Sequence, residues 1–221
     1  MTSGRVLAVA HRAGNTLADF RDAMDAGVDL IEADVHAYRG RLEVRHTKSM
    51  GPLPWLWDRW YLVPKSQPRL VLPDLLAEVE PKTHLMLDLK GVHPRVAPAT
   101  AALVRAMEPA HPVTICTRAW WMLDAFAGLD HVRIVHSARS RRELSRLLRR
   151  LARRHTFGVS VHRDLLTPAI VQALHRHAEV VMTWPVNTKA ELDDVLALGV
   201  TGVISDHLDV LSPLLDGRPP A

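Results

Sequence analysis

Eight short apolar runs, rich in β-branched residues, recur along the chain and constrain its fold more than any other feature. Segments with helical periodicity separate most of them, for example 16–27, 73–80, 167–178 and 188–199. Strands that alternate with helices build a parallel sheet. Eight such units in 221 residues predict a closed (β/α)8 barrel, a TIM barrel, with a doubly wound open sheet as the alternative. The eight runs are 6–10, 29–35, 84–89, 113–117, 132–136, 157–161, 179–184 and 202–206.

One further run, 42–46, breaks this alternation. It follows the second predicted strand after only a few residues that include Arg39 and Gly40, which is too short for a parallel crossover. We therefore predict a β-hairpin that extends beyond the rim of the barrel after the second strand. Its return arm would bring His46 back opposite Ala33.

The composition fits one sizeable soluble domain, which we expect to span residues 1–215 with a disordered tail at 216–221. Hydrophobic residues make up 48% of the chain, and no apolar run reaches the roughly 18 to 20 residues needed to cross a bilayer. The apolar run near the N-terminus is too short for a secretion signal. The single cysteine, Cys116, excludes an internal disulfide and a cysteine-based zinc site. A reducing cytoplasm is the expected compartment.

Residues 139–155 carry eight arginines around four leucines. Leu144, Leu147, Leu148 and Leu151 recur at steps of three and four, which predicts an amphipathic helix with one buried stripe. The first interpretation is a solvated outer face. Weak contact of helix 139–154 with an anionic membrane surface is the alternative, beside nucleic-acid binding. Because no nucleic-acid motif accompanies the helix, we expect no nucleic-acid partner.

Polar residues gather where the predicted strands end. In a (β/α)8 barrel the active site forms at the C-terminal ends of the strands, so these side chains should share one mouth. They are His11 and Arg12 after the first strand, Glu32 and Asp34 on one face of the second, Asp88 and Lys90 on one face of the third, Trp184 and Asn187 after the seventh, and Asp206 after the eighth.

Three of these side chains are carboxylates from two adjacent strands. Glu32, Asp34 and Asp88 would converge in the barrel mouth, where unpaired buried carboxylates are costly. A divalent cation removes that cost, and an all-oxygen ligand set selects a hard ion such as Mg²⁺ or Ca²⁺. We expect one such cation.

Two histidines are predicted to lie beside this cation. His11 and His46 could serve as an acid–base pair for displacement at phosphorus, one removing a proton and the other protonating the leaving oxygen. The cation and Lys90 would stabilise charge on the phosphoryl oxygens. The residues therefore predict metal-assisted phosphodiester chemistry.

Four segments resemble, in order, the sequence blocks of the glycerophosphodiester phosphodiesterase family. They are 10–35, 42–50, 85–91 and 182–206, so the resemblance extends over nearly the whole chain. It implies a (β/α)8 barrel and a phosphoric diester hydrolase. It also implies roles for eight residues: His11 and His46 as the acid–base pair, Glu32, Asp34 and Asp88 as metal ligands, Arg12 and Lys90 as phosphate contacts, and Trp184 in the pocket wall.

The sequence departs from that family at several points. Gly14 precedes Asn15 where the family usually has Pro-Glu, Thr47 replaces an aspartate after the second histidine, and Asp88 replaces a glutamate. The insertion that many members carry after the second histidine is largely missing. The aspartate and the compact chain are similar to the sphingomyelinase D and phospholipase D toxins. This branch of the same PLC-like phosphodiesterase superfamily acts on choline-containing lipids and often forms a cyclic product.

Residues 52–62 hold three tryptophans and a tyrosine shortly after His46. They could form a loop folded onto the barrel, or an apolar wall for an acyl chain or a choline group. The wall favours lysophospholipids, so the expected reaction is hydrolysis or cyclisation of glycerophosphodiesters or lysophospholipids, an activity similar to that of a lysophospholipase D. Two hypotheses of another class are a catalytically impaired barrel that binds a phospholipid or protein partner, and a peripheral binder acting through helix 139–154.

Overall fold

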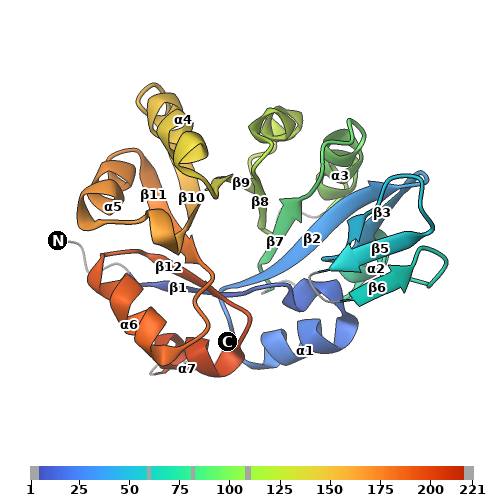
Figure 1. Cartoon of the computed structure of the whole chain (residues 1–221), viewed down its shortest axis with the longest axis horizontal. Helices are drawn as coiled ribbons and strands as arrows, with labels where there is room; N and C mark the ends of the chain where they lie inside the picture. Colours follow the sequence, from blue (N-terminus) through green and yellow to red (C-terminus); the bar gives the residue numbers. More distant parts are fainter. Residues whose placement is uncertain (1–4, 59–60, 81–82, 108–110, 217–221) are drawn as a thin grey trace.

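Eight parallel strands close into a barrel in the computed structural model of the chain, which describes residues 5–58, 61–80, 83–107 and 111–216 (Figure 1). Strand β1 pairs with both β12 and β2, which closes the sheet. The predicted barrel is confirmed, and the open-sheet alternative is wrong. The barrel strands are β1 (Leu7–Ala10), β2 (Leu30–Tyr38), β7 (Leu85–Leu89), β8 (Val113–Thr117), β9 (Val132–Ala138), β10 (Thr156–His162), β11 (Ala178–Trp184) and β12 (Gly202–Ser205).

Helices surround these strands and bury their apolar sides against them (Figure 1). Three α-helices begin after a threonine and one after a serine whose hydroxyl accepts a hydrogen bond from the third helical N–H, which satisfies an otherwise unpaired donor. The helices are α1 (Leu17–Asp25), α2 (Leu72–Ala77), α3 (Val96–Arg105), α4 (Arg141–Leu151), α5 (Pro168–His175), α6 (Lys189–Ala197) and α7 (Leu208–Leu215), with 3₁₀ turns η1 (Ala13–Asn15), η2 (Trp120–Phe126) and η3 (Arg163–Leu165).

The arginine-rich helix α4 has the predicted buried stripe. Leu144, Leu147 and Leu151 are buried, and Leu148 is half-buried. The arginines lie on the outer side, because a helix of this periodicity can bury only one face. No helix among the described residues is long and apolar enough to cross a membrane.

The inside of the barrel changes from apolar to polar along the strands. Its apolar cluster comprises Val9, Leu30, Met86, Cys116, Val135, Met182 and Ile204. Side chains two residues apart on a strand share a face. The next inward positions on β2 and β7 are therefore Glu32 and Asp88, and His11 and Asp206 follow Val9 and Ile204 by the same step. This alternation gathers the polar residues at the C-terminal mouth.

Strand β2 extends beyond the barrel as predicted. It pairs with β7 up to Val35 and then with β3 (Arg41–Val44) in an antiparallel hairpin. Arg39 (φ 47°) and Gly40 (φ 79°) form the two-residue turn, which needs positive φ at both positions. His36 lies on the overhanging part of β2, outside the acidic cluster, as predicted.

The aromatic stretch after His46 is not a loop folded onto the barrel, so that interpretation is wrong. It belongs to a three-stranded antiparallel sheet of β4 (Lys48–Ser49), β5 (Trp55–Asp58) and β6 (Tyr61–Pro64) beside the β2–β3 hairpin (Figure 1). Trp60 lies outside the described residues, as does the predicted tail 216–221 apart from Asp216.

Candidate active site

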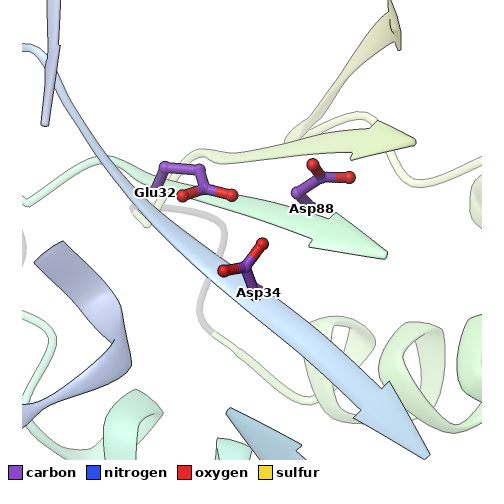
Figure 2. Close-up of side chains that lie close together, drawn as sticks. All are labelled: Glu32, Asp34 and Asp88. Atoms are coloured by element: carbon purple, nitrogen blue, oxygen red, sulfur yellow. The ribbon is translucent and has the colours of Figure 1, made fainter. Parts of the chain in front are cut away.

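The three predicted carboxylates come together at the barrel mouth (Figure 2). Glu32 and Asp34 extend from β2, and Asp88 extends from the neighbouring β7, where its Cα is the direct partner of Asp34. One oxygen from each carboxylate lies within 4.8 Å of the others. Glu32 is 1% exposed and Asp34 is fully buried. The register of two parallel strands thus brings together charges that repel one another.

Lys90 supplies one compensating charge. Its ammonium contacts Asp88 and lies 2.8 Å from Asp34 and 4.0 Å from Glu32. Burial alone would lower the pKa of this amine, but the three carboxylates raise it well above the usual value. Lys90 therefore stays protonated and partly neutralises the cluster.

The carboxylates respond differently to the same surroundings. Burial raises the pKa of Glu32 well above its usual value, and the charge of Asp34 raises it further. Burial and Asp34 also raise the pKa of Asp88. For Asp34, burial would raise the pKa, but Lys90 and a hydrogen bond from His46 lower it well below its usual value. Asp34 is thus the ionised centre of the cluster.

This cluster fits a hard divalent cation. It offers three carboxylate groups and no nitrogen or sulfur ligand, which is the donor set that Mg²⁺ and Ca²⁺ prefer. Three carboxylates face one lysine, and burial together with Asp34 raises the pKa values of Glu32 and Asp88 even though Lys90 lowers them. A divalent cation would supply the missing positive charge.

His11 follows β1 and is oriented by the last barrel strand. Its backbone N–H donates to Ser205, and its Nδ1 lies 2.9 Å from a carboxylate oxygen of Asp206. Burial would raise the pKa of Asp206, but His11 and Asn187 lower it, so its carboxylate is ionised and can only accept. The Nδ1 therefore carries the proton. Nε2 of His11, 4.0 Å from Glu32, is the nitrogen left to exchange a proton.

Arg12 has a left-handed backbone conformation, with φ 60°, which is uncommon for residues other than glycine. This turn directs its backbone N–H at Glu32, 2.7 Å away. Its guanidinium lies 3.9 Å from Asp206, and the buried Nε has no hydrogen-bond partner among the described residues. Arg12 thus retains donor capacity at the mouth, and its role as a phosphate contact stays a prediction.

Asn15 is a site residue to which sequence reasoning assigned no role. Its amide N–H donates to the Asp34 carboxylate at 2.8 Å, and its carbonyl accepts from the Asp34 backbone N–H at 2.9 Å. Gly14 permits this approach, because a Cβ there would lie 2.6 Å from the Cβ of Ala33. The unusual Gly14–Asn15 pair could have given the signal, since it follows the predicted site residues His11 and Arg12 after a single alanine.

His46 returns to the site after the hairpin, as predicted. Its Nδ1 lies 3.1 Å from Asp34, and its Nε2 lies 3.7 Å from Asp58 on β5. Because Asp34 is ionised, Nδ1 of His46 is the protonated nitrogen and Nε2 is left to exchange a proton. Asp58 also places a carboxylate near this histidine, although Thr47 stands where the family usually has aspartate. The β5 strand was not predicted, so neither was this contact.

Strands β11 and β12 complete the mouth. The Trp184 ring is half-buried and meets the His162 ring edge-on, with centroids 5.0 Å apart. The Asn187 amide donates to Asp206 at 2.9 Å, and its carbonyl accepts from the Asp206 backbone N–H at 3.0 Å. Asp206 and Asn187 were predicted to lie at the mouth without a role, and here they hold His11.

Two cavities open beside the histidines. One, of about 620 Å³, is lined by residues that include His46, Asp58 and Tyr61. The other, of about 290 Å³, is lined by residues that include His11 and Asp206. Arg12 lines both cavities. Tyr61 is the one aromatic residue of the predicted apolar wall that lines the larger cavity among the described residues; the tryptophans of β5 do not.

Comparison with known proteins finds one matching family and a shared fold. The profile of the "Glycerophosphoryl diester phosphodiesterase family" matches residues 180–209, which carry Trp184, Asn187 and Asp206. No curated protein matches the sequence.

Two solved structures illustrate the similarity in fold. A glycerophosphodiester phosphodiesterase from Thermotoga maritima is 16% identical, with a TM-score of 0.73 over 95% of this chain and 98% of that one. A phosphodiesterase from Oleispira antarctica, in complex with the product sn-glycerol-3-phosphate, is 15% identical, with a TM-score of 0.75 over 96% and 97% of the two chains. The resemblance predicted from the sequence is thus confirmed by a matching motif and a shared barrel.

Proposed function

We propose that this chain is a phosphoric diester hydrolase that depends on a divalent cation and acts on glycerophosphodiesters or lysophospholipids. The observation that carries the proposal is the pair of histidines on either side of the acidic cluster. Each is held through Nδ1 by an ionised carboxylate, so that Nε2 can exchange a proton. The family match and the shared barrel support the same class of reaction.

Glu32, Asp34 and Asp88 would hold the cation, Mg²⁺ or Ca²⁺. When bound, it would polarise the phosphoryl group and stabilise the charge that develops on its oxygens. Lys90, already protonated beside these carboxylates, would contact the phosphate, and so would Arg12, whose buried Nε has no hydrogen-bond partner in the described part of the chain. Trp184 would form part of the pocket wall.

Proton transfer is assigned to His11 and His46. One would remove a proton from the attacking hydroxyl, which belongs to water in hydrolysis or to the substrate in cyclisation. The other would protonate the leaving alcohol oxygen. The carboxylates of Asp206 and Asp34 fix the ring orientation and tautomer of the two histidines, so no reorganisation is needed for the transfer.

The Oleispira antarctica phosphodiesterase is in complex with its product sn-glycerol-3-phosphate. We therefore propose a small phosphodiester as the substrate of this chain as well. Lysophospholipids are kept because the 620 Å³ cavity beside His46 has an apolar component that includes Tyr61, Val63 and Leu70. A catalytically impaired barrel is not favoured, because both histidines and all three carboxylates have the arrangement described above. Weak membrane contact through the arginine-rich helix, residues 139–154, is kept as a separate proposal.

The proposal is tested by ³¹P NMR of the products from glycerophosphocholine and lysophosphatidylcholine, with Mg²⁺, with Ca²⁺ and with EDTA. We expect release of the alcohol group only with a divalent cation, and the phosphorus shift separates open from cyclic products. Asp88→Asn should reduce turnover sharply and raise the cation concentration needed. Asp193→Asn on the exposed side of α6 is the matched control and should behave like the wild type. Equal turnover in EDTA would contradict the proposal.

A further inference from the structure

The small sheet β4–β6 has two faces of opposite character. Lys48 pairs with Trp57, and Trp57 pairs with Leu62, so these three side chains form one row on the same face. Trp55 lies two residues from Trp57 on that face. Leu56 lies on the opposite face, where it is 1% exposed. We call the face of Lys48, Trp55, Trp57 and Leu62 the outer face.

The outer face is unusually apolar for an exposed surface. Trp55, Trp57 and Leu62 are 41%, 39% and 56% exposed, and Leu53 in the adjoining turn is 49% exposed. Of the seven large apolar side chains that are exposed among the described residues, these four lie on the outer face or in its adjoining turn, and Tyr61 lies on the opposite face. Clustering of this kind marks an interaction surface, whereas single exposed apolar residues need no explanation.

One cation lies on the outer face, and others lie in the neighbouring hairpin and after β6. The Lys48 ammonium lies over the Trp57 ring, 5.3 Å from its centroid. The side chains of Lys65 and Arg39 both lie over the ring of Tyr38 in the neighbouring hairpin, and Arg41 beside them is exposed.

The carboxylates of the same region point inward. Glu43 is buried and paired with Arg45, and Asp58 lies beside His46. Across the described part of residues 38–65, the outer face thus carries Lys48, and neither of the two acidic side chains lies on it.

From this arrangement we infer that the outer face of β4–β6 binds the surface of an anionic phospholipid bilayer. Tryptophan and leucine can enter the boundary between headgroups and acyl chains, while lysine and arginine remain at the phosphate level. Each cation near an anionic surface contributes about 1 kcal/mol to such binding. A protein interface is less well matched, because lysine is depleted at the centre of such interfaces.

The inner face of the sheet connects this surface to the active site. Asp58, Tyr61 and Val63 line the 620 Å³ cavity that contains His46. Docking through the outer face would therefore leave one sheet between the bilayer and the cavity. The inference concerns binding alone, and it stands or falls separately from the proposed reaction.

Co-sedimentation of the full chain with vesicles tests the inference without any turnover. We expect binding to phosphatidylcholine vesicles that contain phosphatidylserine, and weak binding to phosphatidylcholine alone. The double variant Trp57→Ser, Leu62→Ser should bind at least about tenfold more weakly, because burial of each side chain contributes on the order of 1–3 kcal/mol. Lys48→Gln should mainly reduce the preference for phosphatidylserine.

Two controls decide between this surface and others. Trp121→Ser changes a tryptophan that is 52% exposed elsewhere on the barrel, in η2, and should bind like the wild type. Arg149→Gln with Arg153→Gln tests α4 and the turn that follows it, which lie on another side of the barrel (Figure 1). Binding lost in the α4 variant but kept in the outer-face variant would overturn the inference. So would sedimentation velocity showing that the outer face joins two copies of the chain and that vesicles do not bind.

Discussion

The two histidines of the site reach similar positions by different structural routes. His11 belongs to the barrel itself, because it follows β1 and is held by Asp206 just after the adjacent β12. His46 lies outside the closed barrel, on the segment that follows the β2–β3 hairpin. We call these the barrel arm and the hairpin arm. Each histidine directs Nδ1 at a carboxylate, yet only the barrel arm depends on barrel closure.

The difference shows which contacts each arm needs. In the barrel arm, His11 is held in place by strand pairing between β1 and β12 and by the Asn187 hydrogen bonds to Asp206. The hairpin arm is tied by Asp34, a proposed metal ligand, and is approached by Asp58 at 3.7 Å. We therefore expect the barrel arm to be stiffer and the hairpin arm to respond more strongly to loss of the cation.

The largest expected effect comes from removing either histidine. His11→Ala and His46→Ala should each reduce kcat by about 10²–10⁴-fold, the usual contribution of general acid–base catalysis. Single-turnover kinetics with glycerophosphocholine measures the loss, and calorimetry with Mg²⁺ tests whether cation binding persists. If both variants kept near wild-type turnover, the assignment of both arms would be wrong.

Substitution of the carboxylates beside the two histidines should reduce kcat by different amounts in the two arms. Asp206→Asn allows an amide N–H to face Nδ1 of His11, which favours the wrong tautomer, so we expect a loss of about 10- to 100-fold in kcat. Asp58→Asn should cost less than about tenfold, because 3.7 Å exceeds hydrogen-bond distance. A changed pH profile of kcat in Asp206→Asn identifies a positioning effect. A larger loss in Asp58→Asn would reverse the comparison.

Close packing of the turn between His11 and α1 against β2 should contribute to the stability of the fold. Gly14→Ala places a Cβ 2.6 Å from the Cβ of Ala33 on β2, so we expect a loss of about 1–3 kcal/mol in the free energy of unfolding. Gly202→Ala is the matched comparison, because its new Cβ meets the flexible Met182 side chain at the same 2.6 Å. Urea unfolding should show a smaller loss in the free energy of unfolding for Gly202→Ala than for Gly14→Ala. Equal losses in the free energy of unfolding would mean that β2 shifts to accommodate the new Cβ as readily as the Met182 side chain does.

The smallest effect concerns acid stability of the barrel arm. His11 and Asn187 overcome the effect of burial and hold the pKa of Asp206 below its usual 3.8. The ionised carboxylate therefore contributes stability above pH 3.8, and this contribution is lost as pH falls through the lower folded-state pKa. Relative to wild type, Asp206→Asn should lose roughly 1–2 kcal/mol above pH 4, and the difference should narrow below it. A constant difference across urea titrations at several pH values would contradict this.

Much of the fold could be predicted because its determinants are local. Apolar runs and helical periodicity identified the eight barrel strands, and the short Arg39–Gly40 turn identified the hairpin. The spacing of Glu32 and Asp34 indicated a shared face, since strand side chains alternate. Resemblance then assigned roles to His11 and His46.

What only the tertiary structure decided depends on residues far apart in the chain. Asp206 holds His11 across 195 positions, because the barrel closes between β1 and β12. Asn15 reaches Asp34 because Gly14 lets the turn approach β2. Asp58 reaches His46 because β5 pairs into a sheet that the periodicity of the sequence did not predict. The apolar outer face and the inner face of that sheet also follow from strand pairing. Local pattern determines which strands form, but the register between strands determines which side chains meet.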